Sequence, residues 1–385
     1  MITSLSHAEL KRLVQTVFAP TPPDRTIAFL VDVPNARVPD HPAWQERRAL
    51  AVEWQTRLQS QVRDLGLENV GLFYYENVGS NNADLPAHAY TWPGGPSEAT
   101  CERLEREGAA WNLEEVLAES DIVFALTEFS ATAPLKVLAR RHGFRAASMP
   151  GFNREMVPAL RVDFEEVHRR VVEIKTRLDR AEALRIRFEA NGKGYEFSAD
   201  LRYRNAYASS GLLRERGTAG NLPSGESYIV PYEGERGEPS GTAGVLPVQF
   251  HDEIVLYRVE QNRAVQVLSS GAKSEAEQKR LQAEPAYGNI AEIGFGVLRA
   301  FGVQPVGEIL LDEKLGLHVA FGRSDHFGGA TYPSDFSAPE HVVHIDRIFI
   351  PEVQPRVRVL EVTCVYPESG RETLMRVGEY VRLRA

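Results

Sequence analysis

Residues 26–33, TIAFLVDV, form a continuous apolar run, and such a run predicts a strand that is buried on both faces. Three similar runs follow, at residues 69–75 (NVGLFYY), 121–126 (DIVFAL) and 144–149 (FRAASM). The segments between these runs mostly have the apolar spacing of helices. Strands that alternate with helices pair in parallel, so we expect an open parallel α/β sheet in a first domain, residues 1–162.

The rest of the chain has a different pattern. Residues 75–100 contain many Asn, Gly and Pro residues and predict a loop. Residues 163–184 have helical apolar spacing after Asp163, a suitable N-cap, and predict a helix that connects two domains. Short alternating runs then predict antiparallel strands, with one polar helix at residues 273–283. We therefore expect a second, mostly antiparallel β domain over residues 185–385.

The composition limits the possible functions. The 385 residues are 43% hydrophobic and 25% charged, and the net charge of −9 disfavours a general nucleic-acid binder. The two cysteines, Cys101 and Cys364, are far apart, which argues against a disulfide framework and a thiolate zinc site. The chain shows neither a signal-peptide pattern nor an apolar run of membrane-spanning length. We expect a cytoplasmic protein with a small-molecule partner and neither a nucleic acid nor a membrane as partner.

The pair His344 and Asp346, separated by one residue, is the most informative site motif. In an extended segment, residues i and i+2 project from the same face, so both side chains could bind one ion. His341 lies three residues before His344 and would face the other way, so we exclude it from the ligands. Asp325 and His326, in the sequence SDHFGG, are candidates for proton transfer or for orienting a ligand.

Three further donors lie upstream of this pair. Glu226 follows the turn sequence NLPSG, which would place it at the start of a strand. Glu292 lies in the apolar stretch GNIAEIGFG, where a buried carboxylate needs a cation, either an Arg or a metal. His318 lies in the alternating sequence GLHVAFG, with small neighbours on its face. Taken singly, Glu226 could be a solvated surface residue and His318 an ordinary core histidine.

Together these residues form a set of oxygen and nitrogen donors without a thiolate, which suits two divalent cations. The predicted metal ligands are Glu226, Glu292, His318, His344 and Asp346.

The order of the motifs resembles a known family. The succession NLPSGE, AEIGFG, LLDEK, GLHVAFG, FGG and HVVHID is similar to that of the aminopeptidase T and aminopeptidase S family of dimetal metallopeptidases, also called thermophilic-type leucyl aminopeptidases. The stretch SMPGFNREMVPAL and the α/β pattern before it resemble the N-terminal domain of that family.

This resemblance implies that the five matching residues hold two divalent ions, Zn²⁺, Co²⁺ or Mn²⁺. It also implies a homodimer whose N-terminal domain restricts access to short peptides or small amides. The expected reaction is hydrolysis of the N-terminal residue by a water between the ions. Glu292 would either bridge the ions or accept the proton of that water.

Two other functions stay open. The resemblance extends to 2,5-dihydroxypyridine dioxygenases, which hold one Fe(II) on two His and one Asp. In those enzymes a His replaces the match of Glu292, and the matches of Glu226 and His318 are missing, so this chain has the peptidase set. The peptidases carry a Tyr where this chain has Asp325, with His326 as the nearest substitute, and a catalytically inactive peptide-binding relative is the second alternative. The resemblance assigns no role to the lengthened region 353–373.

Overall fold

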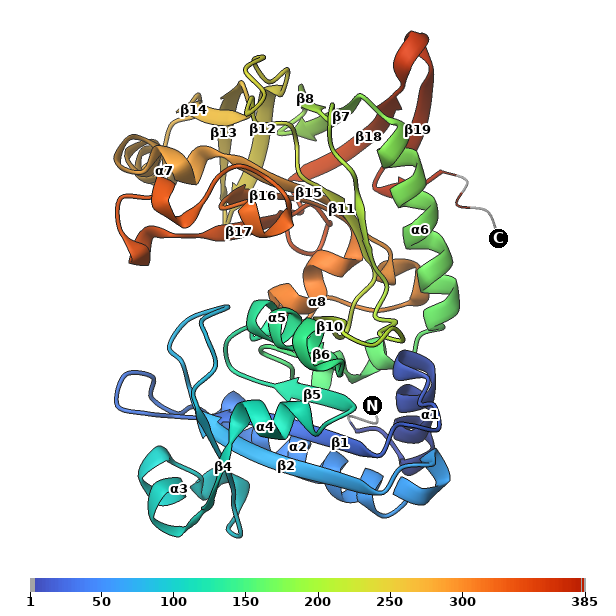
Figure 1. Cartoon of the computed structure of the whole chain (residues 1–385). Helices are drawn as coiled ribbons and strands as arrows, with labels where there is room; N and C mark the ends of the chain where they lie inside the picture. Colours follow the sequence, from blue (N-terminus) through green and yellow to red (C-terminus); the bar gives the residue numbers. More distant parts are fainter. Residues whose placement is uncertain (1–3, 382, 384–385) are drawn as a thin grey trace. The chain divides into compact units, whose positions relative to one another are not determined.

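The chain packs into two compact units, and the computed structural model describes residues 4–381 and 383 (Figure 1). The first unit consists of Met1–Glu165 and Ser209–Ser224, and the second of Glu166–Ala208 and Gly225–Ala385. Residues 209–224 lie within the predicted second domain, yet they pack in the first unit. The reason is that they supply an edge strand to its sheet.

A seven-stranded sheet forms the centre of the first unit. Its strands lie in the order β10 (Ala219–Asn221), β6 (Arg145–Ser148), β5 (Ile122–Leu126), β1 (Thr26–Val33), β2 (Asn69–Glu76), β3 (His88–Thr91) and β4 (Ala109–Asn112). The strands from β10 to β2 pair in parallel, which confirms the predicted parallel sheet. The helices of this unit are α1 (His7–Phe18), α2 (Pro42–Gln59), α3 (Cys101–Glu107), α4 (Leu113–Ala118) and α5 (Thr132–His142).

The predicted loop at residues 75–100 needs a correction. It contains strand β3, which pairs antiparallel with β2 and β4, and a short 3₁₀ helix, η2 (Pro96–Glu98). Only four residues long, β3 is too short to produce a clear apolar period within a Pro- and Gly-rich stretch.

A buried ion pair fixes one end of the parallel sheet. The guanidinium of Arg145, the first residue of β6, lies 2.7 Å from the carboxylate of Asp24, and both side chains are almost inaccessible to solvent. Burial alone would raise the pKa of Asp24, but the Thr21 N–H and the Arg145 guanidinium outweigh burial and hold this pKa below its usual value. Asp24 also forms an ion pair with Arg216 of the same unit, so its carboxylate balances one buried and one half-exposed guanidinium.

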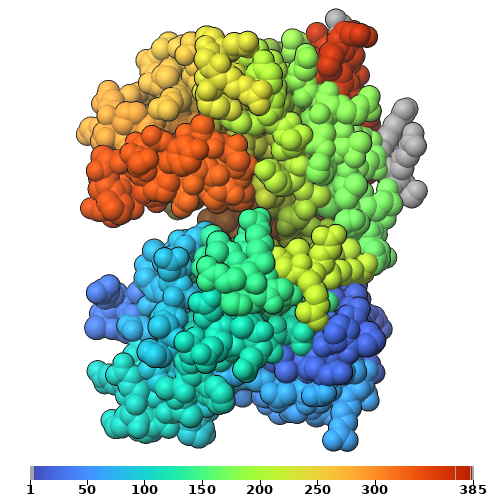
Figure 2. Space-filling model, in the orientation of Figure 1, coloured from blue at the N-terminus to red at the C-terminus, as the bar shows by residue number. Residues whose placement is uncertain are grey.

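The second unit begins with α6 (Phe164–Arg180), the helix predicted at residues 163–184. After it comes an eight-stranded antiparallel sheet, with strands in the order β14 (Arg263–Val267), β13 (Glu253–Glu260), β12 (Ala243–Phe250), β8 (Lys193–Asp200), β7 (Ala183–Ala190), β18 (Val357–Val365), β19 (Arg371–Arg376) and β20 (Glu379–Tyr380). The light-green surface of α6 lies beside the red surface of the β18 and β19 segment (Figure 2). Arg177 of α6 and Glu372 of β19 form an ion pair there, at 3.4 Å.

A five-stranded sheet completes the second unit. Its strands lie in the order β17 (His344–Ile348), β16 (Leu317–Gly322), β15 (Ile290–Gly296), β11 (Glu226–Ile229) and β9 (Tyr207–Ser209), and α7 (Ala272–Ala283) and α8 (Ile309–Asp312) are the remaining α-helices of the described chain. The predicted combination of a parallel α/β sheet and antiparallel β structure is confirmed. No helix in the described residues is long and apolar enough to cross a membrane.

Candidate metal centre

The register of four neighbouring strands places the five predicted ligands on one face of the five-stranded sheet. Ala320 of β16 lies opposite Glu292 of β15 on one side and opposite Asp346 of β17 on the other. In the same way, Gly322 lies opposite His344. Directly paired residues project from the same face and side chains alternate with a period of two, so every second residue along these strands shares this face.

The remaining two ligands follow the same rule. His318 lies opposite Gly294, and Glu226 lies opposite Gly296. The positions between the ligands on this face are therefore glycines or Ala320, which leave space above the sheet. Gly294 is essential to this space, because a Cβ built on it would lie 1.9 Å from Nε2 of His318. The imidazole of His318 thus lies directly over the backbone of β15.

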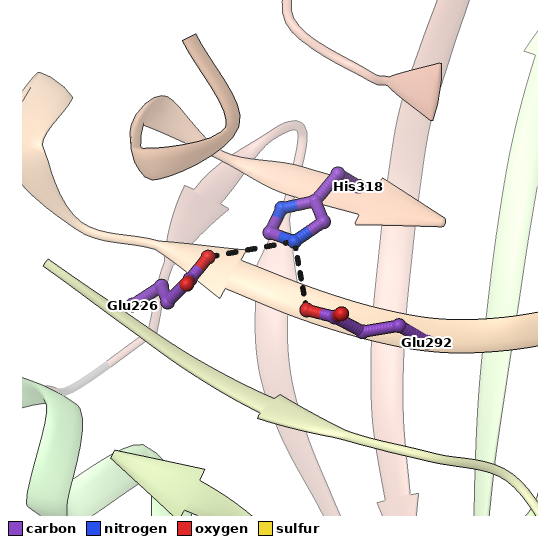
Figure 3. Close-up of side chains that lie close together, drawn as sticks. All are labelled: Glu226, Glu292 and His318. Carbon is purple, nitrogen blue, oxygen red and sulfur yellow. Dashed lines mark hydrogen bonds and ion pairs between the residues drawn. The ribbon is translucent and has the colours of Figure 1, made fainter. Parts of the chain in front are cut away.

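Glu292 occupies the middle of the cluster. Its Oε1 lies 3.4 Å from Nε2 of His318, and its Oε2 lies 3.4 Å from Nε2 of His344. On one side, Oε2 of Glu226 lies 3.5 Å from Nε2 of His318 (Figure 3). On the other side, Oδ1 of Asp346 lies 3.7 Å from Nε2 of His344. The two oxygens of one carboxylate therefore face two separate histidines.

These contacts define two triads that share Glu292. The first triad is Glu226, Glu292 and His318, and the second is Glu292, His344 and Asp346. In each triad the potential ligand atoms lie within 4.8 Å of one another, so each triad could hold a metal ion.

The unsatisfied polar atoms of the cluster agree with this interpretation. Within the described residues, Oε2 of Glu226 and Oδ1 of Asp346 are buried and have no hydrogen-bond partner. Buried polar atoms are nearly always paired, and one such carboxylate oxygen in each triad indicates a missing partner. Nitrogen and carboxylate oxygen donors without sulfur suit borderline and hard divalent cations. The residues present therefore fit a divalent metal.

The electrostatics show how strongly this cluster attracts positive charge. Burial would lower the pKa of His318, yet its hydrogen bond to Glu292 and the charges of Glu226 and Asp346 raise it to about 10. Likewise, Asp346 and Glu292 overcome burial and raise the pKa of His344 to about 9. Burial would raise the pKa of Glu292, but the two histidines hold it well below its usual value. A metal would take over this balancing role and displace the histidine protons, because ligating histidines are neutral.

The backbone orients one of the two histidines. Nδ1 of His344 lies 2.8 Å from the carbonyl oxygen of Arg323, which can only accept a hydrogen bond. The proton of a neutral His344 is therefore on Nδ1, and Nε2 is left with a lone pair that faces Glu292 and Asp346. This is the support that metal-binding histidines commonly receive.

Sequence reasoning missed a charged network behind the first triad. Nζ of Lys314 donates to Oε1 of Glu226 at 2.5 Å and also to the carboxylate of Glu313. Burial raises the pKa of Glu313 to about 8. Burial would lower the pKa of Lys314, but the carboxylates of Glu226 and Glu313 raise it above its usual value. Glu313 and Lys314 both belong to the motif LLDEK. The charged residues that directly follow two leucines in this motif were the sequence feature that could have indicated this network.

The loop after β16 places Asp325 and His326 near the second triad. Asp325 forms an ion pair with Arg323, at 2.5 Å, which outweighs burial and lowers the Asp325 pKa. Burial and the charges of His344 and Arg323 lower the pKa of His326 to about 4, so its ring is neutral at pH 7. The ring centroids of His326 and His344 are 5.2 Å apart. His341, which the sequence excluded, lies outside both triads and contacts the hydroxyl of Ser337 instead, at 2.7 Å.

Aromatic rings border the cluster, and the sequence did not single them out. Tyr228 shares the ligand face, because it lies opposite Gly294. Its ring stacks on Tyr207 with centroids 5.3 Å apart and meets the edge of Phe327 at 5.0 Å. Phe327 in turn lies 5.3 Å from the ring of His344.

Comparison with known proteins places this site on a fold that other proteins share. No family model and no curated protein sequence matches the chain. Among the solved structures that match, two do so over nearly their whole length. The 2,5-dihydroxypyridine dioxygenase from Pseudomonas putida KT2440 is 16% identical with a TM-score of 0.61, and the match covers 98% of each chain. Wild-type AmpT from Thermus thermophilus is 15% identical with a TM-score of 0.54, covering 97% of this chain and 99% of AmpT.

These two similarities confirm the predicted relationship at the level of the fold. At such low identity they show the shared architecture alone and do not distinguish a peptidase from a dioxygenase. The choice between the two activities therefore depends on the residues of the site.

Proposed function

We propose that this protein is a metalloenzyme that removes the N-terminal residue of short peptides by hydrolysis and uses two divalent ions. The observation that carries the proposal is the position of Glu292, whose two oxygens face His318 and His344 at equal distances of 3.4 Å. A carboxylate between two nitrogen donors suits a ligand that two ions share. Glu226 and Asp346 supply one further carboxylate on each side.

The residues of the site have separate roles in this proposal. Ions held in the two triads would supply a water of lowered pKa and polarise the scissile carbonyl. Because both oxygens of Glu292 are engaged, the geometry favours its role as a shared ligand over its role as a proton acceptor. Asp325 is held by Arg323 and is unsuitable as a base. His326 lies beside His344, with ring centroids 5.2 Å apart, and is partly exposed, so its ring would be the group that accepts a proton from the water and donates it to the leaving amine.

Metal content and peptide hydrolysis test the proposal. We expect about two ions per chain and release of free leucine from leucyl dipeptides. The substitution His344→Ala should remove the ion of the second triad and the activity, whereas His341→Ala, a matched change outside both triads, should preserve both. Glu292→Gln should abolish turnover while the fold is retained, as judged by circular dichroism. A protein with two ions per chain that releases no amino acid from any short peptide would disprove the proposed activity.

A mononuclear Fe(II) dioxygenase that cleaves an aromatic ring is the second candidate. Its support is the fold shared with the Pseudomonas putida enzyme and the ring of Phe327 beside His344, with Tyr228 next to Phe327; such rings could stack on an aromatic substrate. One iron per chain, together with oxygen consumption on 2,5-dihydroxypyridine, would establish this candidate over the peptidase.

A further inference from the structure

Lys314 is a fixed cation inside the carboxylate cluster. It lies in the 3₁₀ helix η6 (Glu313–Leu315), and only 1% of its side chain is exposed. Its ammonium group donates to Oε1 of Glu226 and to Glu313. Glu313 contributes no ligand atom to either triad within the described residues. The ammonium therefore acts directly on one predicted ligand, Glu226.

The backbone fixes this contact. A Cβ built on Gly296 would lie 2.1 Å from the carbonyl carbon of Lys314, so η6 can approach β15 this closely only because residue 296 is glycine. The amide N–H of Gly296 also donates to the carbonyl oxygen of Gly316, at 2.8 Å. The backbone of Lys314 is thus held against β15, and its side chain, which is 1% exposed, has no open path to solvent.

The two triads differ in the charge that remains available to an ion. In the first triad, one oxygen of Glu226 is already bound by an ammonium group, so only Oε2 faces His318. In the second triad, the ion-pair partner of Asp346 within the described residues is His344, and no ammonium group contacts its carboxylate. A buried positive charge repels an incoming divalent ion, and this repulsion is strong because burial reduces solvent screening.

We propose that Lys314 makes the two metal sites unequal. The triad of Glu292, His344 and Asp346 binds its ion first and tightly, and the triad of Glu226, Glu292 and His318 binds second and more weakly. This inference rests on the two-ion centre of the proposed function. Its consequence is a stable one-ion form, in which Lys314 balances the charge of Glu226 until the second ion binds.

Calorimetric titration of the metal-free, full-length protein with Co²⁺ tests this order, with native mass spectrometry to count the ions. We expect two binding events whose dissociation constants differ at least tenfold, about 1.4 kcal/mol. Asp346→Asn should remove the tight event. Glu226→Gln should remove the weak event and preserve the tight one.

The substitution Lys314→Met tests the cause. It should strengthen the weak event at least tenfold and leave the tight event unchanged. Lys273→Met is the matched control, because Lys273 pairs with the buried Glu277 at 2.9 Å outside both triads, and it should alter neither event. If Lys314→Met does not fold, Lys314→Gln replaces it, because a neutral amide removes the charge and can still donate a hydrogen bond to Glu226; the same strengthening of the weak event is expected.

Four results would overturn the inference: equal affinities in the natural protein, a tight event that survives Asp346→Asn, a folded Lys314→Met variant whose weak event is unchanged or weaker, or a single binding event in every variant. Peptide hydrolysis is measured separately. Ordered binding of two ions without hydrolysis would refute the proposed activity alone, and hydrolysis with equal affinities would refute this inference alone.

Discussion

Replacing Gly294 with alanine tests whether the register of β15 and β16 builds the first triad. The added methyl group would lie 1.9 Å from Nε2 and 2.1 Å from Cε1 of His318. Ordinary contacts of this kind are about 3.5 Å, so the imidazole would have to move by about 1.6 Å. His318 is fully buried, so its ring cannot move out into solvent to relieve this contact.

This movement affects both metal binding and stability. Nε2 of His318 would leave its positions 3.5 Å from Glu226 and 3.4 Å from Glu292, so the three donors could no longer meet at one ion. We expect Co²⁺ binding in this triad to weaken by at least 10–100-fold, roughly the loss caused by removing the support of a metal ligand. Overpacking costs about 1–3 kcal/mol, and the reduced freedom of the unfolded chain offsets about 0.4–1 kcal/mol, which leaves a net loss of about 1–2 kcal/mol.

Calorimetric titration and urea denaturation of the metal-free protein measure the two effects. Gly194→Ala is the matched control, because Gly194 also lies in a strand but an added Cβ would meet no atom within 4 Å. The control should bind metal normally and change the free energy of unfolding by less than about 0.5 kcal/mol. A Gly294→Ala protein with unchanged affinity for both ions would refute the geometry described for the first triad.

Three further predictions concern stability, metal removal and assembly. Asp24→Asn leaves Arg145 buried without its charge partner and should cost about 3–5 kcal/mol at pH 7 in urea denaturation. The folded pKa of Asp24 is below its unfolded value, so the stability that its charge contributes is present above about pH 4 and is lost as the pH falls. The difference in free energy of unfolding between the natural protein and Asp24→Asn should therefore shrink in acid. A difference that stays constant with pH would contradict this. Chelation with EDTA should abolish peptide hydrolysis. Adding Zn²⁺, Co²⁺ or Mn²⁺ at about 100 times the dissociation constant of that ion should restore hydrolysis and raise the free energy of unfolding by about 2.7 kcal/mol. Activity that persists in EDTA would exclude a metal mechanism. Light scattering should give about twice the chain mass of 43.0 kDa if the predicted homodimer forms, and a single chain mass would exclude it.

The sequence predicted those strands whose residues are apolar without interruption. TIAFLVDV corresponds to β1 residue for residue, because a buried parallel strand needs apolar side chains on both faces. β10 (Ala219–Asn221) was not predicted, since three small or polar residues carry no periodic signal. Its pairing with β6 depends on the tertiary position of the chain, which no local pattern contains.

The same distinction applies to the metal centre. The sequence was sufficient to predict His344, Asp346 and Glu292 as metal ligands. The spacing of the first two and the apolar setting of the third each depend on a few adjacent residues. The burial of Lys314 could not be predicted from the local sequence, since most lysines are exposed and the close approach of its backbone to β15 depends on a glycine at position 296. Its partner Glu226 lies 88 positions away along the chain.

The return of residues 209–224 to the first sheet has a consequence for synthesis on the ribosome. The amide N–H of Ala146 in β6 donates to the carbonyl oxygen of Thr218, at 2.9 Å. Until the nascent chain includes β10, β6 pairs with β5 on one side only and has an open edge on the other. Such open edges readily pair with strands of other chains. The first unit therefore cannot finish folding before α6, β7, β8 and β9 have emerged, and a fragment that stops at residue 165 would keep that edge open permanently.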